Sequence, residues 1–296
     1  GAFVIQDILG QETPLGGMAT ATVTVGTAFM AQVLARLMSV KGRRRGLALG
    51  YGLALAGGLI AGLGVETSSL WIFMIGLFLF GNGQASNLLA RYAATDLAEP
   101  EHRGKAMSRV MFASTFGAVF GPILIKPAER IGEALFGWSL YTGPWIFSGL
   151  FFTFALVNVS IRLRPDPLEV AGRLGSASGP QRSISDVLIP LRHSSASRLA
   201  VAAMVLSQMT MVAIMTMTPV HLKIHGHESV SAFIISLHVA GMYAFSPFIG
   251  RFSDTYGRQR TIQVGALVLI VASAFSSLAG DSPTLLWPGL WLLGVG

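Results

Sequence analysis

Long apolar runs separated by polar segments dominate the chain. A helix needs about 20 apolar residues to cross the hydrocarbon layer of a membrane. Eight runs reach that length, and a ninth begins near Leu285. Because these runs are apolar on every side rather than alternating, they predict helices and not the strands of a membrane barrel. The predicted spans are 15–38, 46–65, 70–89, 106–125, 140–159, 199–220, 231–249 and 261–279.

The composition supports this interpretation. Of 296 residues, 52% are hydrophobic and only 12% are charged, about half the charged fraction of a typical soluble domain. A chain this apolar needs lipid as its solvent, so we expect an all-α, multi-pass membrane protein with the lipid bilayer as a partner. The absence of cysteine excludes a disulfide framework and cysteine-based catalysis or metal binding.

The basic residues predict the orientation of the spans. Lys and Arg are enriched in cytoplasmic loops. If the amino end lies outside, only Lys126, Arg130 and Lys223 of the 21 basic residues fall in outer segments. The net charge of +7 then follows from basic cytoplasmic loops, and no nucleic-acid partner is expected.

A polar segment rich in Pro, Gly, Ser and Arg separates two groups of spans. We predict an amino-terminal helical bundle at 1–163, a cytoplasmic linker at 164–196 and a carboxy-terminal bundle at 197–296. Such a composition is typical of a flexible tether. Residues 183–191 could instead form a short surface helix, because their apolar side chains would share one face.

Two predicted cytoplasmic turns repeat one pattern at an offset of 215 residues. Each copy lies at the end of one span and before the next, as expected for a transporter built from two parallel repeats. The residues that coincide are Arg36 and Arg251, Gly42 and Gly257, Arg43 and Arg258, and Arg45 and Arg260.

The second copy, Gly250-x-x-x-Asp254-x-x-Gly257-Arg258-x-Arg260, resembles the signature loop of the major facilitator superfamily. In that family the loop joins the second and third helices and recurs between the eighth and ninth. The resemblance implies a gating role for this loop. The Asp254 carboxylate could accept hydrogen bonds from basic groups or from a helix N-terminus.

The first copy departs from the family pattern. Ala35 stands in place of the first glycine and Ser39 in place of the aspartate, so Asp254 would have to supply the carboxylate. The resemblance covers essentially the whole chain and aligns the first span here with the family's second helix. It implies a two-bundle transporter fold, truncated, with about nine of twelve helices present.

A second resemblance lies in Gly117-Ala118-Val119-Phe120-Gly121-Pro122, which is similar to the start of the family's antiporter motif. Gly117 and Gly121 are four residues apart and would let another helix pack closely, while Pro122 loosens the backbone. The trailing Gly-Gly of that motif is missing. The alternative is a plain helix-packing motif.

Few polar side chains lie deep in the predicted spans. His238 is a candidate proton carrier, because its unperturbed pKa of about 6.5 suits coupling; alternatively it is a neutral imidazole bonded to a neighbouring helix. Asn87 and Arg91 share a helix face and, with Gln84 and Gln208, could line a solute pathway. These four could instead form hydrogen bonds between helices. Asn82 is a weaker candidate for the same stripe.

No motif indicates an enzyme. Neither a phosphate-binding loop nor a nucleophile elbow is present. His221, His225 and His227 cluster in a predicted outer loop, which we interpret as flexible rather than as a metal site. We therefore expect no metal and no cofactor.

The function expected from the resemblance is secondary active transport. We expect proton-coupled export of small amphipathic solutes by alternating access, by a monomer in a bacterial inner membrane. Metabolite uptake by the same fold is the nearest alternative, and a membrane receptor or scaffold that does not transport is the other.

Overall fold

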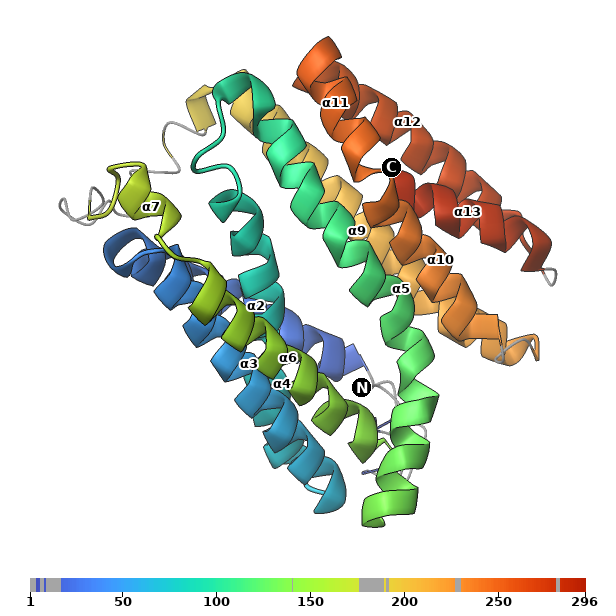
Figure 1. The fold of residues 1–296 in the computed structure, drawn as a ribbon. Helices are drawn as coiled ribbons and strands as arrows, with labels where there is room; N and C mark the ends of the chain where they lie inside the picture. The colour runs from blue at the N-terminus through green and yellow to red at the C-terminus, as the bar shows by residue number, and fades with distance from the viewer. Residues whose placement is uncertain are drawn as a thin grey trace. The chain divides into compact units, whose positions relative to one another are not determined.

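The computed structural model describes residues 4–5, 8, 17–139, 141–175, 189, 192–226, 230–280 and 283–296 (Figure 1). Regular elements within these ranges are all helical, which confirms the all-α prediction. Eight helices among them are long and apolar enough to cross a membrane, the number predicted. These spans contain α2 (Gly17–Lys41), α3 (Arg43–Glu66), α4 (Leu70–Ala93), α5 (Arg103–Phe136), α6 (Thr142–Arg162), α9 (Ser195–Ile224), the pair α10 (Ser231–Ala244) and α11 (Ser246–Tyr256), and α12 (Arg258–Ser277). The shorter apolar helix α13 (Pro283–Val295) follows them.

Contacts divide the chain into two compact units. The first contains Gly1–Leu97 and Leu124–Gly179; the second contains Ala98–Ile123 and Pro180–Gly296. Helix α5 therefore contributes its first part to the second unit and its last part to the first. The division predicted from the sequence, with bundles at 1–163 and 197–296, stays a prediction.

In the first unit, α3 packs against both α4 and α6, and α2 packs against α4 (Figure 1). Small residues make this close approach possible. A Cβ atom at Gly76 of α4 would meet the backbone of Ala61 in α3, so the two helices touch through their main chains. Close contact through glycine is a common means of helix association in membranes, where lipid removes the hydrophobic driving force.

Aromatic rings join α4 to α6 in the same unit. Phe80 lies edge-on to Trp145 and to Phe152, with ring centroids 5.2 and 5.3 Å apart. Phe73 also meets Trp145 edge-on, at 5.5 Å. Edge-to-face geometry brings the positive ring edge to the negative ring face and stabilises each pair by about 0.5–1.5 kcal/mol.

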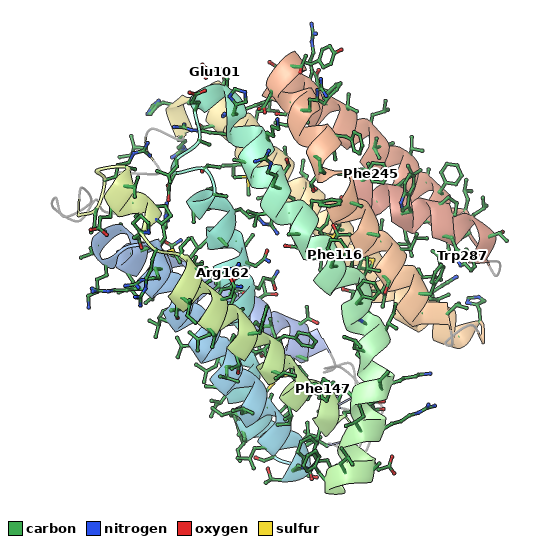
Figure 2. The ribbon with its side chains drawn as sticks, viewed as in Figure 1. Glu101, Phe116, Phe147, Arg162, Phe245 and Trp287 are labelled. Atoms are coloured by element: carbon green, nitrogen blue, oxygen red, sulfur yellow. The ribbon has the colours of Figure 1, made fainter. Side chains whose placement is uncertain are left out.

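In the second unit, α13 packs against α10 (Ser231–Ala244) and α12. Apolar side chains from these helices and from α9 form the core. Phe245, labelled in Figure 2, lies edge-on to Trp291 with centroids 5.4 Å apart. The fully buried members of this core include Leu222, Ile234 and Leu290.

The predicted span 231–249 is one membrane crossing made of two helices, α10 and α11 (Ser246–Tyr256). The break follows from Pro247, which has no amide hydrogen and whose ring disturbs the preceding turn. The amides of Phe248 and Ile249 both donate to the carbonyl of Phe245, at 3.0 Å, and this begins the second segment.

Helix α6 ends at Arg162 (Figure 2), close to residue 164, where the predicted linker begins. The linker contains the short helix α7 (Pro167–Val170), which the sequence did not predict. The possible surface helix at 183–191 lies almost entirely outside the residues that the structure describes.

Candidate functional site

The two signature turns have the same backbone conformation. Gly42, between α2 and α3, has φ 91° and ψ 160°. Gly257, between α11 and α12, has φ 89° and ψ 154°. This combination is essentially restricted to glycine, because a Cβ atom would clash with the backbone. The repeat seen in the sequence is therefore a repeat of structure at this point.

The amino-terminal turn contains a shielded ion pair. Arg43 donates from Nε to Oδ2 of Asp96 at 2.8 Å and from Nη2 to Oδ1 at 3.1 Å. The two side chains are only 16% and 8% exposed. Two parallel bonds of this kind fix the guanidinium in one orientation, so the pair ties the start of α3 to the end of α4. Arg36, in contrast, is exposed near the end of α2.

The carboxy-terminal turn lies against the start of α5 within the second unit. A Cβ atom at Gly104 would fall 2.5 Å from Oδ1 of Asp254. One at Gly250 would fall 3.0 Å from the Gly104 carbonyl and from the hydroxyl of Ser108. The Asp254 carboxylate thus sits at a helix N-terminus, where the helix dipole favours negative charge. Arg251, Arg258 and Arg260 are exposed.

The Gly117–Pro122 motif lies in the part of α5 that belongs to the second unit. Within the described part of the chain, no atom of another element lies within 4 Å of a Cβ placed at Gly117 or Gly121. Helix α5 continues past Pro122 to Phe136, and the boundary between the units follows at Ile123. The helix-packing role of the motif stays a prediction.

The polar stripe of α4 has the geometry expected for one helix face. Nη2 of Arg91 donates to Oδ1 of Asn87 at 3.1 Å. Gln84 is exposed, and Asn87 and Arg91 are partly exposed. Asn82 does not belong to this stripe, because it is fully buried and its amide donates to the Leu79 carbonyl at 2.7 Å. Gln208 is exposed on α9, in the other unit.

His238 is buried between α10 and α13, with 2% of its surface exposed. Its Nδ1 atom lies 2.9 Å from the Leu290 carbonyl. A carbonyl oxygen only accepts hydrogen bonds, so Nδ1 carries the hydrogen and Nε2 has the free lone pair. This contact fits a side chain that links two helices; the proton-carrying role stays a prediction.

The prediction that His221, His225 and His227 lie in an outer loop is wrong for His221, which belongs to the last turn of α9, and His225 follows directly after that helix. The rings of His221 and His225 lie 4.2 Å apart, and Nδ1 of His225 is bonded to the His221 carbonyl at 2.8 Å. The absence of a metal site here stays a prediction. His227 lies outside the described residues.

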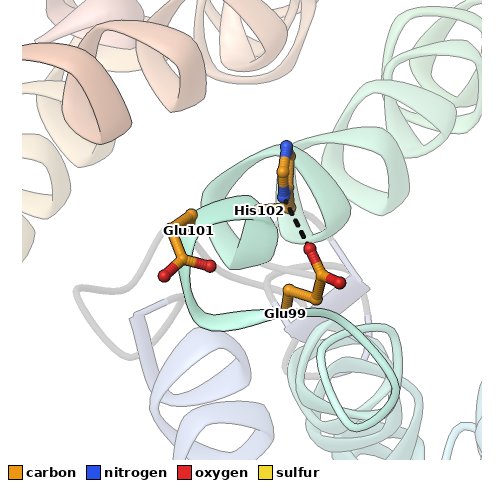
Figure 3. A group of neighbouring side chains, drawn as sticks. All are labelled: Glu99, Glu101 and His102. Carbon is orange, nitrogen blue, oxygen red and sulfur yellow. Dashed lines mark ion pairs between the residues drawn. The ribbon is translucent and has the colours of Figure 1, made fainter.

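A polar turn before α5, absent from the sequence-based candidates, brings three possible ligand side chains together (Figure 3). One atom each of Glu99, Glu101 and His102 lies within 4.8 Å of the others, and all three residues are exposed. Nδ1 of His102 is 3.5 Å from Oε2 of Glu99. Because every member is exposed, we interpret this group as a solvated turn rather than as a built metal site.

The second unit also contains a cavity of about 570 Å³ between α9, α12 and α13. Its wall is apolar with several hydroxyl groups, and the hydroxyl of Ser276 has no hydrogen-bond partner among the residues described. Sequence reasoning missed this cavity, because its hydroxyl groups come from helices far apart in the chain. The lining residues are Thr210, Ala213, Ile214, Met217, Thr218, His221, Ser273, Ser276, Ser277 and Leu286.

Comparisons with known proteins agree on the family. The chain is 36% identical over 304 residues to the uncharacterized MFS-type transporter YddS of Bacillus subtilis, covering 100% of this chain and 69% of the relative. It is 30% identical over 292 residues to the riboflavin transporter RfnT of Brucella anthropi, covering 97% and 70%.

Among solved structures, the fold is similar to that of the E. coli xylose transporter XylE in a partially occluded inward open conformation. The TM-score is 0.58 at 18% identity, covering 95% of this chain and 71% of XylE. Because the family model of the Major Facilitator Superfamily also matches residues 2–296, the chain belongs to that family of membrane transporters.

Proposed function

We propose that the protein is a secondary active transporter that exports small amphipathic solutes in exchange for protons by alternating access. It would work as a monomer in a bacterial inner membrane. Family membership supports transport of a small solute, and the partial antiporter motif at Gly117–Pro122 supports the direction. The stripe of Gln84, which is exposed, and of Asn87 and Arg91, which are partly exposed, would supply polar contacts for the solute.

The observation that carries the proposal is the position of Asp254 at the first turn of α5. A carboxylate at a helix N-terminus contributes about 0.3–1 kcal/mol at an exposed site. An interaction of this size can be made and broken during a transport cycle. It would therefore act as a latch on the cytoplasmic side, favouring one of the two states of alternating access.

His238 is the residue that we propose carries the proton. With Nδ1–H held by the Leu290 carbonyl, Nε2 is the atom that would gain and lose the proton. Protonation at Nε2 leaves the bond to Leu290 intact. The charge on His238 could then change while the packing of α10 against α13 is kept.

Metabolite uptake is the second candidate. It is favoured by the similarity to RfnT, whose name gives riboflavin as its substrate. Riboflavin combines an aromatic ring system, one edge of which is apolar, with a hydroxylated chain, so it also serves as an amphipathic test solute. The two candidates differ in the direction of flux relative to the proton gradient.

Flux across liposomes tests both candidates. The protein would be reconstituted, and movement of riboflavin or of the amphipathic cation ethidium would be followed by fluorescence under an imposed pH gradient. Antiport predicts solute movement against the proton flow, whereas uptake by symport predicts movement with it. A protonophore should abolish either one. Absence of flux with every solute tested would favour a receptor or scaffold.

His238→Asn is the matched variant for the proton step. Asn can donate to the Leu290 carbonyl from nearly the position of Nδ1 but does not titrate. If His238 carries the proton, the variant binds solute normally and loses coupling to the pH gradient. Unchanged coupling would remove His238 from the mechanism, and loss of coupling only in His238→Ala would indicate a packing role.

A further inference from the structure

The first residues of the predicted linker are bound to the amino-terminal signature turn. Asp166, between α6 and α7, uses both carboxylate oxygens. Oδ1 accepts from the amide of Leu168 at 3.0 Å and so caps α7. Oδ2 accepts from the amide of Arg44 at 2.8 Å, in the first turn of α3.

The space for this carboxylate exists because residue 42 is glycine. A Cβ atom at Gly42 would overlap the carboxyl group of Asp166. Gly42 precedes α3 and has no side chain with which to cap it. The orphan amide of Arg44 is therefore satisfied by a side chain 122 residues away in the sequence.

A second contact holds the same stretch of linker at its other end. The amide of Gly175 donates to the carbonyl of Ser39 at 3.1 Å, near the end of α2. Between the two contacts, the side chains of Pro167 and Leu168 are buried. Residues 166–175, which we call the linker clasp, are thus docked on the turn by two polar contacts, with two buried apolar side chains between them.

The local charge favours the same contact. Arg43, Arg44 and Arg45 follow Gly42 directly, and the N-terminus of α3 adds the positive end of the helix dipole. The Asp96 carboxylate is already engaged by Arg43. The signature position in this copy is Ser39, which carries no charge. Asp166 therefore supplies a second carboxylate to this turn, and it is the one that accepts from the amide of Arg44 at the start of α3.

We propose that Asp166 is a positioning residue, and that through it the linker clasp sets how readily the amino-terminal unit changes state. The mechanistic part of this inference rests on the proposed transport function. The clasp joins the start of α3 to the segment that leads toward α9. Movement of the amino-terminal helices must therefore either carry the linker with them or break the bond from Arg44 to Asp166.

Asp166→Ala is the direct test, and Glu169→Gln is its matched control. Glu169 is an exposed carboxylate on the same short helix, and none of the contacts above involves it. Loss of an N-terminal cap costs about 1 kcal/mol, so exchange of the Arg44 amide should become about fivefold faster in Asp166→Ala. Trypsin should also cleave faster after Arg173, whereas the control should match the wild type in both.

Asp166→Asn separates hydrogen bonding from charge, and it also serves if the alanine variant fails to fold. Its amide oxygen can still accept from Arg44, so exchange should lie between wild type and Asp166→Ala. In flux assays, both variants should change turnover while KM for riboflavin stays constant, because Asp166 does not contact solute. A changed KM with unchanged turnover would contradict the positioning role.

The linker clasp and the transport function are tested by different measurements, so either one can fail while the other stands. If Arg44 exchange and cleavage after Arg173 in Asp166→Ala match the Glu169→Gln control, the linker clasp is overturned, whatever the transport result. If both increase but the wild-type protein moves no solute, the clasp stands and the proposed transport function fails.

Discussion

The two signature turns share a backbone but differ in what surrounds it. At Gly42 the turn is covered, since Asp166 fills the space beside it and Arg43 is paired with Asp96. At Gly257 no atom of another element among the described residues lies within 4 Å of the place that a Cβ atom would take, and Arg258 is exposed. The glycine conformation is therefore the repeated feature, whereas the carboxylate comes from the linker in one half and from the loop itself in the other.

This difference indicates which half is held rigidly. The amino-terminal turn combines a bidentate ion pair, a capped helix start and the docked linker clasp. The carboxy-terminal turn depends on one exposed carboxylate at the start of α5. A contact that must form and break during a transport cycle should be weak, because a small change in free energy then shifts the equilibrium between the two states.

Replacing each turn glycine with alanine should give the largest difference in stability between the two turns. The backbone strain alone costs about 1–3 kcal/mol at either position. Gly42→Ala also forces Asp166 aside, which adds about 1–3 kcal/mol of overpacking. Thermal unfolding in detergent should therefore show a clearly larger loss for Gly42→Ala than for Gly257→Ala. Equal losses would mean that the Asp166 carboxylate does not occupy this space.

Replacing the first arginine after each turn glycine should also destabilise the two halves of the protein to different extents. Arg43→Gln leaves the carboxylate of Asp96, only 8% exposed, without its ion-pair partner. Breaking a buried pair costs about 3–5 kcal/mol, and partial exposure here reduces that to about 2–3 kcal/mol. Arg258→Gln should change stability by less than about 0.5 kcal/mol. Thermal unfolding in detergent compares the two variants. A large loss of stability in Arg258→Gln would contradict the difference between a covered turn at Gly42 and an open turn at Gly257.

Replacing glycine with alanine should reduce stability at a packed position and leave it unchanged at an open one. Gly76→Ala pushes α4 away from the backbone of Ala61, at a cost of about 1–3 kcal/mol. Gly117→Ala meets no other element within 4 Å in the described structure and should be neutral to within about 0.5 kcal/mol. If Gly117→Ala destabilised the protein as much, that motif would be a packing site in the membrane.

Neutralising the latch should have the smallest effect on stability. Asp254→Asn removes a charge at the start of α5, where an exposed carboxylate contributes about 0.3–1 kcal/mol. We expect a shift in the midpoint of thermal unfolding close to the detection limit, but a measurable change in turnover. A stability loss as large as that of Arg43→Gln would show that this contact is structural and not a latch.

The sequence was sufficient to predict the helices, because their existence depends on the length of apolar runs. It also located Gly42 and Gly257 through the repeated basic pattern around them. The break at Phe245 was within reach, since Pro247 removes an amide hydrogen that a continuous helix would use.

The contacts of individual side chains could not be predicted in the same way. The bond from Arg44 to Asp166 spans 122 residues, and no local pattern indicates which carboxylate reaches a given helix end. Asn82 and Asn87 lie on one helix and look alike in the sequence. The first is fully buried against its own unit, and only the packing of α4 distinguishes them.

The central claim is that the two matching turns lie on the same side of the membrane. None of these 296 residues is cysteine, so single cysteines can be placed at Arg45, Arg260 and, as an outer control, Glu133, with the unsubstituted protein as the background control. In intact cells, a membrane-impermeant maleimide should label only the Glu133→Cys variant, and permeabilisation should expose the other two together. Labelling of Arg45→Cys and Arg260→Cys from opposite sides would contradict the account.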